Sequence, residues 1–243
     1  MCTLTIAWRT FRDAPVVVAA NRDEAVDRPA EPPAERDEGI VAPRDAEAGG
    51  TWMGATRDGL FVGVTNRWVE GLAGERSRGL LVDDCLHAEA AEAAARLVES
   101  RCRDHEYDGF NLVVADADAA LLLEWDGHLS VTPFEPGVHV VVNVGADGAF
   151  VEPPDRPDVG PEQAANARRL RDHLQVRPDE SASSWLRRAG DALGDHEFGV
   201  CVHGDGYGTV SSSLLLLGAD GSRRYEYAAG PPCETPYEVV YDE

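Results

Sequence analysis

The chain contains no lysine, so all 22 of its basic residues are arginines, and 44 acidic residues bring the net charge to −22. The acids are dispersed along the chain rather than gathered in a tail. At 1 M salt the Debye length is about 3 Å, which screens the self-repulsion of such a surface. We therefore expect adaptation to a high-salt cytosol, the alternative being a merely acidic mesophilic protein. The same charge disfavours binding to nucleic-acid backbones and docking on anionic membranes.

Long apolar runs are missing as well. No stretch of about 18 apolar residues exists, and the first residues lack the regions of a signal peptide. We therefore expect a cytoplasmic protein without membrane insertion. The cysteines are Cys2, Cys85, Cys102, Cys201 and Cys233. An odd count is untypical of a disulfide framework, and the sequence has no CxxC pair that would indicate a zinc site. We predict no metal site, because Cys201 and His203 together supply only two ligands.

Strand and helix patterns alternate in blocks along the chain. Alternating or continuous apolar runs predict strands at 3–8, 16–20, 51–56, 60–65, 110–115, 119–125, 128–132, 138–144, 199–203, 207–217 and 224–228. Helical periodicity predicts helices at 80–102, 162–175 and 180–193. Hairpin-connected strands with segregated helices indicate an α+β fold with mainly antiparallel sheets. We expect a single domain over 1–243, with a long surface loop at 24–50 and a proline-rich linker at 145–161.

The second residue is a cysteine, which is small enough for an aminopeptidase to remove Met1. A chain that begins at Cys2 carries a thiol and an α-amine, whose ordinary pKa is about 7.7–8.0. One residue then supplies both a nucleophile and its general base. Taken alone, a cysteine at position 2 is more simply explained by chance. Whether it is a nucleophile therefore depends on which residues lie near it.

The first predicted hairpin places a polar cluster beside Cys2. If Trp8 faces Val16, facing residue numbers sum to about 24, and Cys2 faces Arg22 to within two positions. An arginine beside a thiol lowers its pKa, and a carboxylate such as Asp23 can hold an α-ammonium group. The alternative is that the segment Asn-Arg-Asp-Glu at 21–24 is an ordinary polar exit from a strand.

The start of the chain, Met-Cys-Thr-Leu, and the segment at 21–24 resemble the NRDE family, also called the transport and Golgi organisation protein 2 family. Further matching segments, in family order, are 28–29, 44–45, 49–54, 65–67, 77–79, 109–112, 142–143 and 207–209. The family is similar to N-terminal nucleophile hydrolases of the choloylglycine-hydrolase type. This resemblance implies a four-layer αββα sandwich with the nucleophile at the start of a central strand.

The resemblance also implies roles for single residues. Cys2 would attack an amide carbonyl, Asp23 would hold the α-amine, and Asn66 and Asn143 would stabilise the oxyanion, a role suited to side-chain amides. Turn chemistry at strand ends is the alternative for the two asparagines. The chain departs from the family at Val210, where members usually carry arginine, so the charge of that arginine is missing. Arg22 and Arg67 are the candidates to replace it.

These residues leave three hypotheses about function. The first is a Cys2 amidohydrolase or acyltransferase that acts on a small amide or acyl substrate and needs no cofactor. The second is a non-catalytic carrier of haem or lipid, a role linked to the eukaryotic branch of the family. The third is a protein that keeps the fold without activity, which the valine at 210 favours.

Overall fold

The computed structural model describes residues 2–37, 39–154 and 156–243. The chain divides into two compact units. Unit 1 is formed by Met1–Arg28 and Pro136–Glu243, and unit 2 by Pro29–Glu135. That both units belong to one domain stays a prediction.

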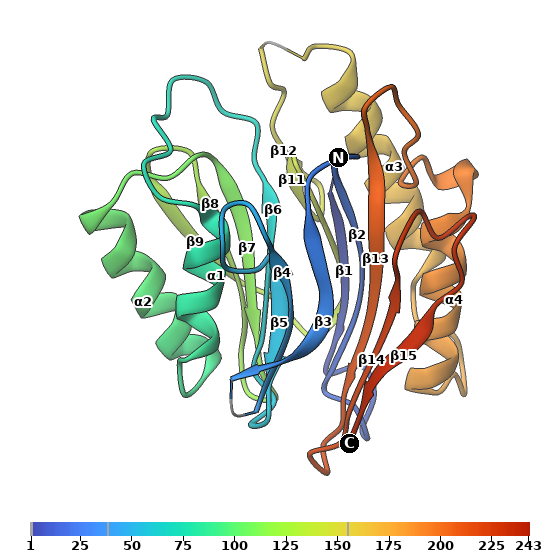
Figure 1. Ribbon diagram of the computed structural model, residues 1–243. Coiled ribbons are helices and arrows are strands. Elements are labelled where there is room, and N and C mark those ends of the chain that lie inside the picture. The colour runs from blue at the N-terminus through green and yellow to red at the C-terminus, as the bar shows by residue number, and fades with distance from the viewer. Residues whose placement is uncertain (1, 38, 155) are drawn as a thin grey trace. The chain divides into compact units, whose positions relative to one another are not determined.

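Over the described residues, unit 1 contains one eight-stranded antiparallel sheet in the order β12-β11-β10-β1-β2-β13-β14-β15. Helix α3 packs against β10, and α4 packs against β2 and β13 (Figure 1). The strands are β1 (Thr3–Trp8), β2 (Val16–Ala25), β10 (Gly137–Val142), β11 (Gly145–Ala146), β12 (Ala149–Phe150), β13 (Tyr207–Leu217), β14 (Arg223–Ala228) and β15 (Glu238–Asp242). The helices are α3 (Val159–His173), α4 (Ala182–Gly194) and the short 3-10 helix η1 (His196–Phe198).

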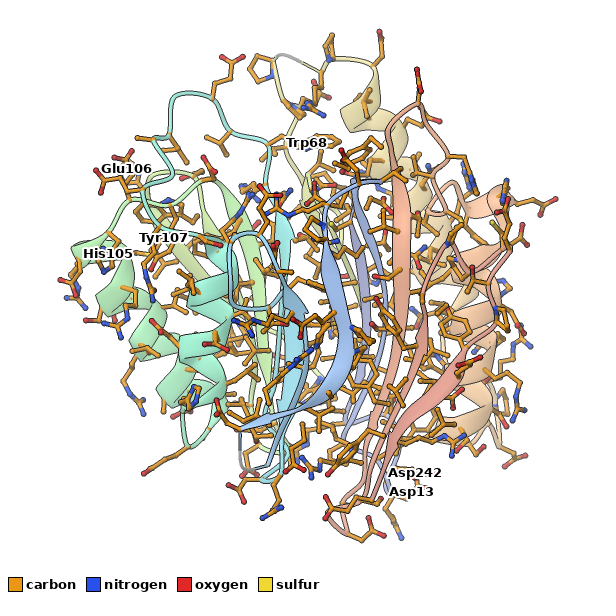
Figure 2. All side chains as sticks on the ribbon, viewed as in Figure 1. Asp13, Trp68, His105, Glu106, Tyr107 and Asp242 are labelled. Atoms are coloured by element: carbon orange, nitrogen blue, oxygen red, sulfur yellow. The ribbon has the colours of Figure 1, made fainter. Side chains whose placement is uncertain are left out.

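The centre of this sheet is buried on both faces. All six residues of β1 and the first eight of β2 are buried, so the threonines of β1 do not mark a solvent face as their alternation suggests. The Thr5 hydroxyl donates to the carbonyl of Ala19 at 2.8 Å, which satisfies a buried polar group. Asp13, in the β1–β2 connection, and Asp242, in β15, both lie at the end of the sheet away from the start of β1 (Figure 2).

Over the described residues, unit 2 contains a seven-stranded antiparallel sheet in the order β3-β4-β5-β6-β7-β8-β9. Helix α1 packs against β5 and β6, and α2 packs against β7 and β8 (Figure 1). The strands are β3 (Ala30–Asp37), β4 (Ile40–Asp45), β5 (Met53–Thr56), β6 (Phe61–Asn66), β7 (Phe110–Ala115), β8 (Ala120–Trp125) and β9 (Leu129–Pro133). The helices are α1 (Arg78–Leu86) and α2 (Ala91–Asp104). Tyr107, which follows α2 (Figure 2), is buried edge-on against Phe110, and Phe110 stacks on Trp125.

The prediction of a long surface loop at 24–50 is wrong, because β3 and β4 occupy most of it. Two prolines in β3 hid the strand pattern. They are tolerated because β3 is an edge strand whose pairing with β4 is irregular. Arg36 stabilises the irregular part: its guanidinium donates to the carbonyl of Pro32 at 2.9 Å and of Ala42 at 3.0 Å, and it contacts Glu31 at 2.6 Å.

The predicted helix at 80–102 is two helices, because α1 ends at Leu86 and α2 begins at Ala91. No glycine or proline marks this break. Ala90 is extended and provides no side-chain cap. The cap comes from Asp116, whose Oδ2 accepts the Ala91 N–H at 2.7 Å and suits the positive end of a helix. A partner 25 residues away is invisible to local periodicity.

Two shorter predictions are also corrected, and one strand was missed. The linker at 145–161 contains the β11–β12 hairpin and the start of α3. The segment 199–203 forms only an isolated bridge between His203 and Gly208. Gly199 has a left-handed φ of 64° and Cys201 lies at a bend, so neither is in a strand. The edge strand β15 was not predicted. Within the described residues, no helix has both the length and the apolar character needed to cross a membrane.

Candidate active site around Cys2

Cys2 lies one residue before β1, at the end of a central strand of unit 1 (Figure 1). Trp8 pairs with Val16, and the pairs along β1 and β2 keep the same sum of residue numbers, so the predicted register is confirmed. Extending this register by one residue brings Cys2 level with Arg22. The sequence therefore predicted correctly which polar segment accompanies Cys2.

On the other side of β1, Cys2 lies beside Asn143. Thr3 pairs with Val142, so the next position along brings Cys2 and Asn143 level. The main-chain N–H of Cys2 donates to Asn143 Oδ1 at 3.0 Å. Gln163 of α3 donates its Nε2 to the same oxygen, also at 3.0 Å. The amide oxygen of Asn143 is thus held facing the Cys2 nitrogen, and Gln163 is a site residue that sequence patterns did not reveal.

Asp23 is buried beside the thiol and connects β2 to β13. Its Oδ1 accepts the Thr209 hydroxyl at 2.5 Å. Its main-chain carbonyl accepts the Tyr207 hydroxyl at 3.1 Å and is 3.6 Å from the Cys2 Sγ. Thr209 in turn accepts the N–H of Val202 at 2.9 Å. The Tyr-Gly-Thr segment, noted in the sequence without a role, therefore positions Asp23.

Asn21 has a structural part in the same segment. Its Nδ2 donates to the carbonyls of Leu193 at 3.0 Å and Val200 at 2.9 Å. This fixes the end of α4 and the chain after η1 to β2. The polar segment at 21–24 is therefore more than a solvated exit from a strand: Asn21, Arg22 and Asp23 are all buried.

Burial is the main cause of the shifted pKa values of Cys2 and Asp23. Burial raises the pKa of the Cys2 thiol above its ordinary value, and the nearby Asp23 adds to the rise. Arg22 acts in the expected lowering direction, but burial outweighs it, and Arg22 lies 3.9 Å from Glu24. Burial also raises the pKa of Asp23, although the Thr209 hydroxyl favours its ionised form. The thiol is thus protonated at neutral pH and needs a base to become a nucleophile.

Val210 occupies a β-bulge at the edge of this site. Thr209 pairs with Asp23 while Ser211 pairs with Arg22, so Val210 is the extra residue of β13. A bulge re-aims the inserted side chain and is frequent beside functional sites. Position 210, where the family resemblance implies an arginine, is therefore the inserted residue of a β-bulge. In this chain its side chain is uncharged.

Asn66, the fifth predicted site residue, lies in unit 2 at the end of β6, where it pairs with Phe110 of β7. The adjacent Arg67 is engaged within that unit, donating to Asn111 at 2.9 Å and to Glu124 at 2.6 Å. The structure thus brings together Cys2 and the three predicted residues of unit 1. The oxyanion role of Asn66 stays a prediction.

Known structures share this fold. The N-acylethanolamine-hydrolyzing acid amidase ortholog of Caenorhabditis elegans superposes with a TM-score of 0.57 at 15% identity, covering 88% of this chain and 92% of that one. Conjugated bile acid hydrolase of Clostridium perfringens, in a variant whose cysteine at position 2 is alanine, gives 0.53 at 11% identity, covering 99% and 92%. The predicted fold class, the αββα sandwich of N-terminal nucleophile hydrolases, is confirmed.

The sequence relatives point to one family. Transport and Golgi organization protein 2 homolog of Bos taurus is 28% identical over 232 residues, which cover 85% of this chain and 83% of the relative. The Homo sapiens homolog is 26% identical over 231 residues, with the same coverage. Residues 1–227 match the family profile described as Transport and Golgi organisation 2. The chain belongs to the Transport and Golgi organisation 2 family.

Proposed function

We propose that the protein is an amidohydrolase or acyltransferase that uses Cys2 as its nucleophile after removal of Met1. The observation that carries this proposal is the position of Cys2. Its nitrogen faces Asn143 Oδ1 at 3.0 Å, and its Sγ lies beside the buried Asp23. The named activities of the fold neighbours, an N-acylethanolamine-hydrolyzing acid amidase and a conjugated bile acid hydrolase, support a hydrolytic reaction.

The proposed reaction uses the α-amine as a proton carrier. The free amine of Cys2 takes the thiol proton, and the thiolate attacks the amide carbonyl. The tetrahedral intermediate collapses as the leaving amine receives that proton, which leaves a thioester on Cys2. Water, or another acyl acceptor, then cleaves the thioester and restores the thiol. The raised pKa of the thiol makes such a base necessary.

Two neighbours support this cycle. Asn143 Oδ1 is an acceptor that keeps the amine oriented while it gains and loses a proton. The carboxylate of Asp23 stabilises the ammonium form electrostatically, as a buried charge beside a cation does. A side-chain amide has one acceptor and one donor group, so any donation from Asn143 to an oxyanion would come from its Nδ2.

Inserting one glycine between Met1 and Cys2 tests this proposal. The mature chain would keep the thiol but lose the α-amine of Cys2. We expect hydrolysis in a panel of N-acyl amides and thioester acyl donors to fall by about 10²-fold or more, the usual contribution of general acid–base catalysis. Intact mass would establish which chain start each sample carries. Equal turnover with and without the glycine would contradict the proposal.

A second candidate is a non-catalytic carrier of haem or an acyl ligand. The names of the sequence relatives favour it, because they refer to transport and Golgi organisation rather than to hydrolysis. Such a carrier needs no nucleophile. Titration with haemin against competing albumin discriminates the two candidates, since a carrier gives a saturable shift of the Soret band in the presence of albumin.

We also propose that the lysine-free, acidic surface fits the protein to high salt. Between 0.1 and 2 M KCl we expect the melting temperature to rise by about 5 °C, which in a chain of this length corresponds to about 2 kcal/mol. The reason is that screening removes the mutual repulsion of the 44 acidic residues. Thermal unfolding followed by circular dichroism measures this effect. A melting temperature that stays constant or falls in KCl would exclude it.

A further inference from the structure

Four side chains outside the Cys2 site converge in unit 1. The ligand atoms of His196, Cys201, His203 and Cys233 all lie within 4.8 Å of one another. The two Sγ atoms are 3.5 Å apart, and His203 Nε2 is 3.1 Å from the Cys233 Sγ and 3.7 Å from the Cys201 Sγ. The rings of His196 and His203 stack with centroids 5.3 Å apart.

The three separations among Cys201, His203 and Cys233, from 3.1 to 3.7 Å, are close to those of a tetrahedral metal site. Zinc binds sulfur at about 2.3 Å and imidazole nitrogen at about 2.0–2.1 Å, so the ligand atoms of a tetrahedral site lie roughly 3.3–3.8 Å apart. We propose that His196, Cys201, His203 and Cys233 bind one zinc ion as a closed structural site. Two thiolates with two imidazoles are a set that favours zinc over the hard cations magnesium and calcium. The sequence-based expectation of no metal site considered only two of the four ligands.

Three of the ligands come from one short, well-anchored segment. His196 lies in η1, which ends at Phe198, and the left-handed φ of 64° at the next residue, Gly199, turns the chain sharply. A side chain at that position would also collide with Asn166. Cys201 lies at a bend, and His203 lies in the isolated bridge to Gly208. This part of the chain brings the Cys201 Sγ and the His203 Nε2 to 3.7 Å from each other.

The fourth ligand arrives on a separate loop. Pro231 starts a tight turn in which its carbonyl accepts the N–H groups of Glu234 at 3.0 Å and Thr235 at 2.9 Å. This turn presents Cys233. The loop passes so close to Gly194, at the end of α4, that a Cβ there would lie 3.1 Å from the Pro232 backbone. The backbone thus brings Cys233 against the segment after α4.

A disulfide does not account for the pair of cysteines. Both are free, and their sulfur atoms are 3.5 Å apart, far beyond the bonded distance of about 2.05 Å. Zinc would bind both cysteines as thiolates and release their two protons to solvent, with no change in oxidation state. The imidazoles would bind in their neutral form.

The zinc ion would support the neighbouring site without taking part in chemistry there. The N–H of Thr209 donates to the carbonyl of Val202 at 2.8 Å, between two of the proposed ligands. Thr209 also donates to Asp23. Zinc would therefore link the end of α4, the loop of Cys233 and the segment that positions Asp23. This inference holds whether or not Cys2 is a nucleophile.

Metal titration of the reduced, chelator-treated full chain tests the proposal. Cobalt(II) should bind at one ion per chain, with thiolate-to-cobalt charge transfer and the intense visible bands of tetrahedral coordination, and zinc should displace it. Excess Mg²⁺ in the buffer would occupy exposed carboxylates, which prefer hard cations. Zinc should also protect Cys201 and Cys233 from alkylation and raise the melting temperature.

Cys233→Ser, an exposed position in a loop, should weaken cobalt binding at least tenfold and abolish the tetrahedral bands. The matched control Cys102→Ser removes a cysteine of unit 2 and should bind cobalt as the parent does. Charge-transfer bands that persist unchanged in Cys233→Ser would overturn the proposal. So would no thiolate–cobalt band in the parent, or a Cys201–Cys233 disulfide in protein kept anaerobic with zinc.

Discussion

Replacing Cys2 with serine is expected to lower kcat for amide hydrolysis by about 10⁴-fold or more, the scale on which loss of a nucleophile acts in hydrolases. Serine keeps the α-amine, the small second residue that permits removal of Met1, and nearly the same volume. It changes only the attacking atom, and a hydroxyl is a much weaker nucleophile than a thiol at neutral pH. Steady-state hydrolysis of the best substrate in the amide panel measures the effect.

Cys102→Ser provides the matched control for this substitution. Cys102 lies on α2 in unit 2, and burial raises the pKa of its thiol to about 11, so its loss should leave turnover unchanged. Full activity in Cys2→Ser would exclude the nucleophile. Haemin binding that is the same in Cys2→Ser and in the parent, together with no turnover in either, would instead favour the carrier.

Asp23→Asn is expected to separate activity from stability. Turnover should fall by about 10²-fold, because the neutral amide no longer stabilises the α-ammonium of Cys2. The melting temperature at pH 7 should instead rise by about 3 °C, the shift that about 1 kcal/mol produces in a chain of this length. Asparagine retains an oxygen that can accept the Thr209 hydroxyl but removes a buried charge, which is costly to keep ionised.

The gain in stability should depend on pH in a defined direction. The pKa of Asp23 is raised in the folded chain, so the folded chain holds a proton on Asp23 to higher pH than the unfolded chain does. The contribution of Asp23 to the free energy of unfolding therefore falls as the pH rises above about 3.9, the pKa of aspartate in an unfolded chain. Asparagine has no such dependence. The advantage of Asp23→Asn should therefore be present at pH 7 and vanish below about pH 4.

Asp13→Asn is the control for both readouts. Asp13 is exposed in the β1–β2 connection, at the far end of the sheet (Figure 2). Its substitution should leave turnover unchanged and should not reproduce the gain in melting temperature. If Asp23→Asn destabilised the protein at pH 7, Asp23 would be held by a strong ion pair in the folded state, and burial would not dominate its pKa.

The sequence predicted the part of the site that depends on the pairing of neighbouring strands. The β1–β2 register followed from alternation and one facing pair, Trp8 with Val16, and it placed Arg22 level with Cys2. The role of Gln163 could not be predicted, because a buried polar residue on a helix looks like any solvated one until its partner, Asn143, is known. The same applies to the Thr209 hydroxyl on Asp23, which depends on how β13 pairs with β2.

Longer-range contacts explain the predictions that failed. Helix α2 begins where Asp116 caps it from a distant turn, and no periodicity reports such a cap. The edge strand β3 contains two prolines that are acceptable only at an edge. The proposed zinc ligands are separated by up to 37 residues, from His196 to Cys233. Motif spacing alone could not unite them, since the loop of Cys233 is placed by its approach to Gly194.

The central claim is that Cys2 carries the acyl group during turnover, and mass spectrometry of the acid-quenched reaction tests it most directly. The parent protein, mixed with its best acyl donor and quenched within one turnover, should gain one acyl mass. Peptide mapping should place that mass on the N-terminal peptide beginning at Cys2. An acyl group found only on another cysteine, such as the exposed Cys233, or no acylated chain during measurable turnover, would contradict the account.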